Sequence, residues 1–196
     1  MDKRVILASN SPRRQELLRN LGIEFDVIPD NTPETISREL TPDEIVCSLA
    51  KFKGDNVISN LDKDTDALVI SADTVVAVDD KVLGKPVNKE DAVRMLSELS
   101  GRAHYVYTGV YIRDILSGNS VFFYEKTEVF FKKLDIIEIK DYINTGEPMD
   151  KAGAYGIQNL GSLFVEKING DYFNVVGLPV CRLCKVLKED FNFRVF

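Results

Sequence analysis

Two adjacent arginines stand in the first turn of a predicted helix, directly after an apolar segment that is typical of a strand. The strand is predicted over residues 4–8, and Ser11, Pro12, Arg13 and Arg14 follow it. Ser11 is suited to cap a helix N-terminus, and Pro12 suits the first helical position. Helix N-termini attract anions, whereas cations there oppose the macrodipole unless an anion lies between. The segment therefore predicts either a phosphate or carboxylate site or two solvated arginines on an ordinary capped helix.

A carboxylate follows the most apolar segment of the chain. Residues 67–72 predict a buried strand, and Asp73 comes directly after it. In open α/β sheets the carboxyl ends of strands meet the ligand crevice, where a buried carboxylate needs a metal, a cation or a hydrogen-bond donor. A predicted hairpin near 75–84 would bring Lys85 back beside Asp73. Asp73 is the strongest candidate for chemistry, and the alternative is that it caps the following turn.

Two further charged residues and the single histidine each have a functional and a structural interpretation. Lys53 falls on the apolar stripe of a helix predicted over 42–59, where it either snorkels at the helix edge or reaches a bound anion. Glu34 lies in a turn-rich loop and by itself would be a solvated acid. His104, the single histidine, has no partner serine or cysteine arrangement and is expected to be structural.

Composition narrows the class of protein. The chain has 196 residues and a formal net charge of -6, which argues against a nucleic-acid polymer as the main ligand but leaves room for a small polyphosphate in one cationic cleft. It has no apolar run long enough to span a membrane and no GxxxxGK[ST] motif, so we expect a cytoplasmic protein without a P-loop. Cys181 and Cys184 have CxxC spacing, yet both thiols are expected to pack on a helix, and zinc or redox roles are the alternatives.

The periodicity predicts α/β organisation. Strands and helices alternate through the first half, and two long β-rich segments and a further helix follow. A long irregular loop with several glycines comes next, and long irregular loops in compact domains are usually functional. The predicted ranges are strands 4–8, 24–28 and 67–72, helices 12–21, 42–59, 89–100 and 135–145, strands 104–113 and 120–131, and a loop from about 147 to 161.

Six ordered motifs resemble the Maf family of nucleoside triphosphate pyrophosphatases along nearly the whole chain. They are S-N-S-P-R-R-Q-E-L-L at 9–18, S-A-D-T-V-V at 71–76, G-K-P at 84–86, L-S-G-R-A-H-Y-V-Y-T-G-V at 99–110, D-K-A-G-A-Y-G-I-Q at 150–158 and K-I-N-G-D-Y-F-N-V-V-G-L-P at 167–179. The D-K-A-G-A-Y-G-I-Q segment is similar to the branch that acts on dTTP and UTP.

The resemblance implies a fold, a set of site residues and a cofactor. The implied fold is one Maf-like domain over 1–196: an α/β structure in which a mixed twisted sheet is flanked by helices, with two lobes around a central cleft as in inosine triphosphate pyrophosphatases. A divalent cation, Mg²⁺ or Mn²⁺, and a homodimer are also expected. The implied roles are phosphate binding by Ser9, Arg13, Arg14, Lys53 and Lys85, metal binding by Glu34 and Asp73, proton acceptance by Asp73, and substrate choice by Arg13, Thr74 and Gln158.

The chain departs from the family branch in the base-reading loop. The branch usually reads G-I-Q-G-L-G-G, whereas Asn159 and Ser162 stand here in place of two glycines. Asparagine tolerates a positive φ better than most residues, so the loop conformation is expected to persist. Two other functions were considered, a non-catalytic nucleotide-binding regulator of cell division and a nucleotidyltransferase. The acidic residues disfavour the regulator, and no second substrate pocket is evident for the transferase.

Overall fold

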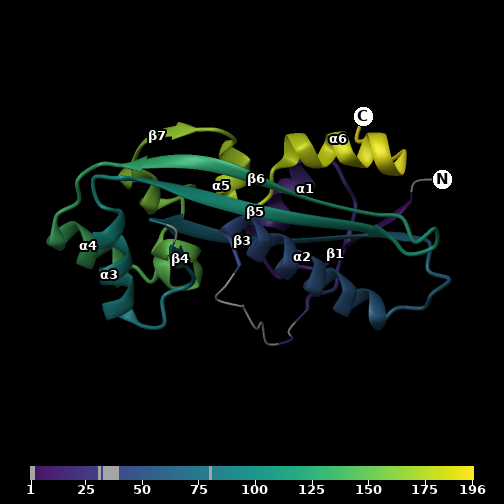
Figure 1. Cartoon of the computed structure of the whole chain (residues 1–196), viewed down its shortest axis with the longest axis horizontal. Helices are drawn as coiled ribbons and strands as arrows, with labels where there is room; N and C mark the ends of the chain where they lie inside the picture. The colour runs from purple at the N-terminus through teal and green to yellow at the C-terminus, as the bar shows by residue number, and fades with distance from the viewer. Residues whose placement is uncertain (1–2, 31, 33–39, 80) are drawn as a thin grey trace. The chain divides into compact units, whose positions relative to one another are not determined.

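The computed structural model describes residues 3–30, 32, 40–79 and 81–196. Within these residues seven strands form one mixed sheet in the order β2-β1-β3-β5-β6-β7, and β4 pairs with β3 (Figure 1). β1 (Arg4–Leu7) runs parallel to β2 (Asp26–Val27) and to β3 (Ala67–Val78), while β4 (Lys81–Leu83) is antiparallel to β3. β7 (Val165–Asn169) is antiparallel to β6 (Ser120–Phe131), which follows β5 (Ala103–Asp114). The α/β class and mixed sheet expected from the sequence are therefore confirmed.

The chain divides into two compact units, and the division falls inside the three longest strands. Unit 1 comprises 1–73, 108–125 and 177–196, and unit 2 comprises 74–107 and 126–176. Each unit is consequently made of segments that are far apart in the sequence. Among the described helices, none combines the length and apolar content that crossing a bilayer requires.

In unit 1, α2 (Pro42–Ser59) packs closely on the sheet. An added Cβ on Gly109 of β5 would lie 2.4 Å from the backbone of Val46, so only glycine permits this approach. The Ser71 hydroxyl of β3 donates to the Ala50 carbonyl at 2.6 Å. The sequence Thr41-Pro42-Asp43-Glu44 has the pattern of a capping box, and the Glu44 carboxylate accepts from the N–H and hydroxyl of Thr41 at the start of the helix. The remaining helices of this unit are α1 (Pro12–Asn20) and α6 (Val180–Phe191).

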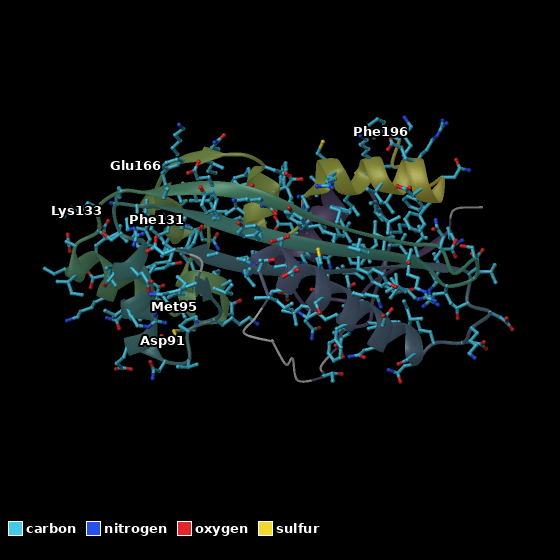
Figure 2. The ribbon with its side chains drawn as sticks, viewed as in Figure 1. Asp91, Met95, Phe131, Lys133, Glu166 and Phe196 are labelled. Carbon is cyan, nitrogen blue, oxygen red and sulfur yellow. The ribbon has the colours of Figure 1, made fainter. Side chains whose placement is uncertain are left out.

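Unit 2 has its own apolar core beneath two neighbouring helices, α3 (Lys89–Leu99) and α4 (Ile136–Asn144). Met95 of α3 and Phe131 of β6 belong to this core (Figure 2). The Asp135 carboxylate caps α4 by accepting from two backbone N–H groups of the first turn, a role typical of an aspartate directly before a helix. Short helices complete the unit: η1 (Glu147–Asp150), η2 (Ala152–Ala154), η3 (Leu160–Phe164) and α5 (Tyr172–Val176).

Two predictions about the backbone were wrong. The strand predicted over 67–72 continues as β3 to Val78, so Asp73 lies within a strand rather than after its end. No glycine or proline interrupts residues 72–78, and β4 pairs with the continuation of the strand. The irregular loop predicted after residue 146 is instead a series of 3₁₀ turns. Such turns suit a segment whose glycines and proline break longer helices.

Candidate active site

Arg14 is the fixed part of the predicted anion site. Its side chain is buried, with Nε donating to the Gly177 carbonyl at 2.8 Å and Nη1 donating to Ser9 Oγ at 3.2 Å. The backbone N–H of Ser11 also donates to Ser9 Oγ, at 3.2 Å. Ser11 is the N-cap residue of α1, but its own side chain makes no capping bond in the described structure. The reading of Arg14 as a solvated residue is therefore wrong, and Arg13 beside it is half-buried.

Lys53 and Asp73 form a buried ion pair. Lys53 Nζ lies 2.5 Å from Asp73 Oδ1, and the two side chains are 16% and 12% exposed. The lysine on the apolar stripe of α2 thus reaches a carboxylate on the neighbouring strand. Asp73 is not the turn cap that the sequence left open, because it lies inside β3. Two buried charges of opposite sign stabilise each other where either alone would be costly.

The strand register brings this ion pair and the anion segment to the same part of unit 1. Leu7 of β1 is opposite Ile70 of β3, and the Ala8 N–H donates to the Ile70 carbonyl at 2.8 Å. Because β1 and β3 are parallel, continuing this register past Leu7 brings Ser9 level with Ala72, the residue directly before Asp73. Four of the predicted residues therefore lie in the same part of unit 1, around the C-terminal end of β1, the N-terminal end of α1 and the middle of β3. They are Ser9, Arg14, Lys53 and Asp73.

Asp30 is an acidic residue of this region that the sequence analysis did not select. Its carboxylate accepts from the N–H and hydroxyl of Thr32, at 3.0 and 2.6 Å, and from the Asn56 amide at 3.2 Å. Burial raises the pKa of Asp30, but these hydrogen bonds and the charge of Lys53 outweigh it and hold the pKa below its usual value. Its position just after a short parallel strand was the signal that could have identified it.

The remaining predicted residues belong to unit 2 or lie outside the described structure. Thr74 is half-buried in β3, Lys85 is exposed after β4, and Gln158 is half-buried between η2 and η3. The Gly84 carbonyl, next to Lys85, accepts from the Gly153 N–H at 3.0 Å. Glu34 lies outside the described residues.

One carboxylate organises the segment that carries Gln158. Glu147 accepts from the Tyr142 hydroxyl at 2.9 Å and from the backbone N–H groups of Leu160 and Gly161 at 3.1 and 3.2 Å. The Tyr142 oxygen in turn accepts from the Gly156 N–H at 3.2 Å. Burial, together with the hydrogen bond to Glu147, raises the pKa of Tyr142 well above its usual value, which keeps the hydroxyl protonated as a donor. Glu147 and Tyr142 are positioning residues that no local motif identifies.

Asn159, which replaces a family glycine, has a negative φ. Asn159 has φ -114°, so it does not need the left-handed conformation in which asparagine was expected to replace glycine. The strict glycine requirement falls on Gly161, where an added Cβ would lie 2.5 Å from the Gly156 carbonyl oxygen. The expectation that this segment persists without the two family glycines is thus consistent with its backbone.

His104 is structural, as expected. The ring is fully buried in the core of unit 2 and lies edge-on to Phe131 and Tyr155, with centroids 4.8 and 5.3 Å away. Its Nε2 lies 2.8 Å from the Tyr155 hydroxyl. Burial lowers the pKa of His104 to about 3, so the imidazole is neutral at neutral pH.

A divalent cation near Asp73 would need oxygen ligands. Within the described residues no three acidic, histidine or cysteine side chains come together as a complete metal centre. Mg²⁺ commonly uses one or two carboxylates and takes its other ligands from water and substrate phosphates. The carboxylate of Asp73 is one oxygen donor of that kind.

Comparison with known proteins places this arrangement in a family. A family model described as Maf-like protein matches residues 4–190. A protein of Alkaliphilus metalliredigens named dTTP/UTP pyrophosphatase is 49% identical over 193 residues, which cover 98% of this chain and 99% of that protein. A protein of the same name from Thermoanaerobacter sp. strain X514 is 50% identical over 192 residues, with 98% and 99% covered.

The solved structure of the Staphylococcus aureus Ham1 protein aligns with 66% of this chain and 72% of the Ham1 chain, with a TM-score of 0.46 and 14% sequence identity. The family match and the full-length relatives are far stronger and agree with the six sequence motifs. This chain belongs to the Maf-like protein family.

Proposed function

We propose that the protein is a nucleoside triphosphate pyrophosphatase that hydrolyses dTTP and UTP between the α and β phosphates. The products are the nucleoside monophosphate and pyrophosphate. The observation that carries this proposal is identity of about half of all positions, along nearly the whole chain, to proteins named dTTP/UTP pyrophosphatase. The buried polar groups of unit 1 support it, since Arg14, Lys53 and Asp73 are side chains suited to phosphate binding and proton transfer.

The proposed reaction is a direct attack by water. The Asp73 carboxylate accepts a proton from the water, the water oxygen forms a bond to the α-phosphorus, and the bond from that phosphorus to the bridging oxygen breaks. Pyrophosphate leaves with the bridging oxygen, so no covalent enzyme intermediate is needed. Lys53 holds the Asp73 carboxylate by their ion pair and so fixes its orientation.

Cations supply the binding energy for the triphosphate. We propose that Arg13, Arg14, Lys53 and Lys85 bind phosphate oxygens, with Ser9 orienting Arg14. A divalent cation, Mg²⁺ or Mn²⁺, held by Asp73 and by Glu34, would reduce the negative charge of the phosphates. Gln158 can both accept from the imide N–H of thymine or uracil and donate to a ring carbonyl, which is the basis for the proposed base preference, with Thr74 and Arg13 also affecting substrate choice. A cytoplasmic location and a homodimeric state remain predictions.

Product analysis tests the proposed reaction directly. Purified protein is incubated with dTTP, UTP, CTP, ATP and GTP in Mg²⁺ or Mn²⁺, and the products are separated by ion-exchange chromatography. We expect dTMP and UMP with equimolar pyrophosphate, and no turnover after chelation of the metal. Release of diphosphate and orthophosphate would contradict α–β cleavage. Tight nucleotide binding with no product would instead favour a non-catalytic regulator.

Asp73→Asn tests the proposed proton acceptor. The amide keeps the size of the carboxylate but loses its basicity, so we expect kcat to fall by about 10²–10⁴-fold with Mg²⁺ saturating. Asp79→Asn is the matched control, because Asp79 is an exposed acid paired with Arg102. Circular dichroism establishes that both variants fold. Near-normal turnover in Asp73→Asn would place the proton acceptor elsewhere.

Gln158→Ala tests the proposed role in base selection. We expect the ratio of kcat/KM for UTP to that for CTP to fall by about tenfold or more. In the wild type, cytosine leaves polar groups of the Gln158 amide unpaired, and the alanine variant removes that penalty. Ser162→Ala serves as the control, since Ser162 is exposed in the same segment. An unchanged substrate profile in Gln158→Ala would remove this residue from base recognition.

A further inference from the structure

The two cysteines at the start of α6 differ in exposure. Both thiols were expected to pack, but the structure leaves Cys181 exposed and Cys184 half-buried. Val180, Leu183 and Leu187 form the buried stripe of this helix. At about 100° of rotation per residue, Cys184 falls at the edge of this stripe, whereas Cys181 falls well outside it. One thiol is therefore accessible to solvent and the other lies one turn behind it.

The spacing of the pair suits thiol–disulfide chemistry. Side chains three residues apart on a helix have Cβ atoms about 5–6 Å apart, and a disulfide needs a Cβ separation of about 3.5–4.5 Å. Closing the bond therefore requires a local adjustment within the first turn of α6, which begins after Pro179. Burial and then the charge of Cys181 raise the pKa of the Cys184 thiol. Cys181, in the first turn of α6, is the thiol that solvent reaches.

A cationic cavity adjoins the half-buried thiol. After α6 the chain reverses at Asn192, where φ is +52°, and the Phe193 N–H donates to the Leu187 carbonyl at 2.9 Å. The reversal places the last residues of the chain beside the helix, as the position of Phe196 in Figure 2 shows. The cavity between them has a volume of about 370 Å³, and its walls include Cys184, the cations Lys185, Lys188 and Arg194, and the acid Glu189.

The charged side chains that line this cavity are mainly cationic, although the whole chain is acidic. Three cations and one acid line it, although the formal net charge of the protein is -6. A small anion is therefore attracted to the wall that contains Cys184, and Cys181 lies one turn away on the same side of the helix. The site thus combines an accessible thiol, a second thiol within reach, and a cationic binding surface.

We propose that Cys181 and Cys184 form a thiol–disulfide exchange site for small anionic disulfides. The Cys181 thiolate attacks one sulfur of the disulfide, forming a mixed disulfide and releasing one small thiol, which takes up the proton that Cys181 lost. The Cys184 thiolate then attacks the sulfur of Cys181, and the second small thiol leaves with the proton from Cys184. The protein dithiol is oxidised by two electrons, and the small disulfide is reduced to two thiols.

Oxidised glutathione is a suitable anionic probe. The fully reduced protein is incubated with it, and intact mass and peptide mapping follow the reaction. We expect the wild-type chain to lose two hydrogens and two of its three free thiols, with the new bond joining Cys181 to Cys184. Cys47 is the internal control, because burial raises the pKa of this half-buried thiol, and Cys47→Ser should behave as wild type.

Single-cysteine variants test the order of the two steps. In Cys184→Ser the reaction should stop at a stable adduct of one glutathione on Cys181. In Cys181→Ser the loss of thiols should be at least about tenfold slower, because the attacking thiolate is absent. An adduct on Cys184 before Cys181, or reaction of Cys47 as fast as Cys181, would overturn the proposal.

Charge variants test the role of the cavity. Lys188→Gln and Arg194→Gln together should slow the reaction with oxidised glutathione by about three- to tenfold, but should not slow the reaction with cystamine, a cationic disulfide. Lys140→Gln, at an exposed position of α4, is the matched control. Equal slowing with both disulfides, or with neither, would show that the cavity does not recruit the anionic reagent and would overturn that part of the proposal.

Discussion

Arg14 joins the first turn of α1 to the segment that precedes α6. Its guanidinium donates from one side to the Gly177 carbonyl and from another to Ser9 Oγ, although Gly177 is 163 residues away in the sequence. The planar fork of arginine can satisfy two acceptors at fixed angles while remaining charged. The same side chain can therefore hold the backbone and present positive charge to an anion.

Arg14→Lys should weaken both stability and substrate binding. Lysine retains the charge but cannot reproduce the two directed hydrogen bonds, so we expect a loss of about 1–3 kcal/mol in the free energy of unfolding and a higher KM. Arg19→Lys is the control, since Arg19 is exposed on the same helix and donates to the side chain of Gln15. Denaturant titration and steady-state kinetics measure the two effects. Equal stability of the two variants would contradict the structural role of Arg14.

His104 makes the stability of the protein depend on pH. Its pKa is lowered from 6.5 to about 3 in the folded chain by burial, so below pH 6.5 the unfolded state binds more protons. The free energy of unfolding should therefore fall as the pH falls from 6.5 towards 3, by up to about 1.4 kcal/mol per pH unit, and this contribution should be constant above 6.5.

The measurement is urea unfolding between pH 7.5 and 5.0. His104→Gln removes the titrating ring while keeping an amide that can bond the Tyr155 hydroxyl, so the variant should show a smaller slope below pH 6.5. Carboxylates also contribute at the acidic end, and the difference between the two proteins isolates the histidine. Parallel pH profiles would show that His104 does not titrate across the unfolding transition.

At the scale of elements, the segment that carries Gln158 depends on contacts from η1 and α4. Glu147 of η1 binds Tyr142 of α4 and two backbone N–H groups at the start of η3. A single carboxylate that accepts three hydrogen bonds can fix a segment that has little regular structure of its own. The position of the segment that carries Gln158 therefore depends on α4, η1 and η3 together.

Glu147→Gln should loosen this segment selectively. The neutral amide has one acceptor oxygen in place of two, so at least one N–H of Leu160 or Gly161 loses its partner. We expect faster hydrogen exchange at these two amides and a cost of about 1–3 kcal/mol. Glu138→Gln, which alters the ion pair with Lys132, is the control. Unchanged exchange at residues 160–161 would contradict the positioning role.

At the scale of the whole molecule, three long strands contribute residues to both compact units. β3, β5 and β6 each begin in one unit and end in the other, and each unit contains segments from distant parts of the sequence. Neither unit is a continuous stretch of chain that could be released by a single cut. We therefore expect the chain to unfold in one cooperative transition.

Leu96→Ala tests that cooperativity. Leu96 is fully buried in the core of unit 2, and its truncation should cost about 2–5 kcal/mol. Hydrogen exchange at Ile6 and Leu7 of β1, in unit 1, should accelerate to the extent expected from the same loss of global stability. Protection of β1 that remains at the wild-type level would show that the two units unfold separately.

The sequence by itself determined most of the elements. Capping residues marked the beginnings of α2 and α4, apolar periodicity marked the long strands, and six ordered motifs indicated the family. These features depend on residues close together in the chain, which is why they can be predicted from local patterns. The candidate residues were also selected from their sequence positions: Arg14 because cations oppose the macrodipole at a helix N-terminus, and Lys53 and Asp73 because charged side chains are unusual on apolar segments.

Only the tertiary structure decided which partners these residues have. β3 extends past Asp73 because β4 pairs with its second half, and Lys53 reaches Asp73 because α2 packs closely on the sheet. The Gly177 carbonyl, the Glu147 carboxylate and the cavity beside Cys184 depend on segments that meet only in the folded chain. Local propensity contains no information about such distant contacts, since they form when packing and hydrogen bonding of the whole chain outweigh the conformational entropy lost on folding.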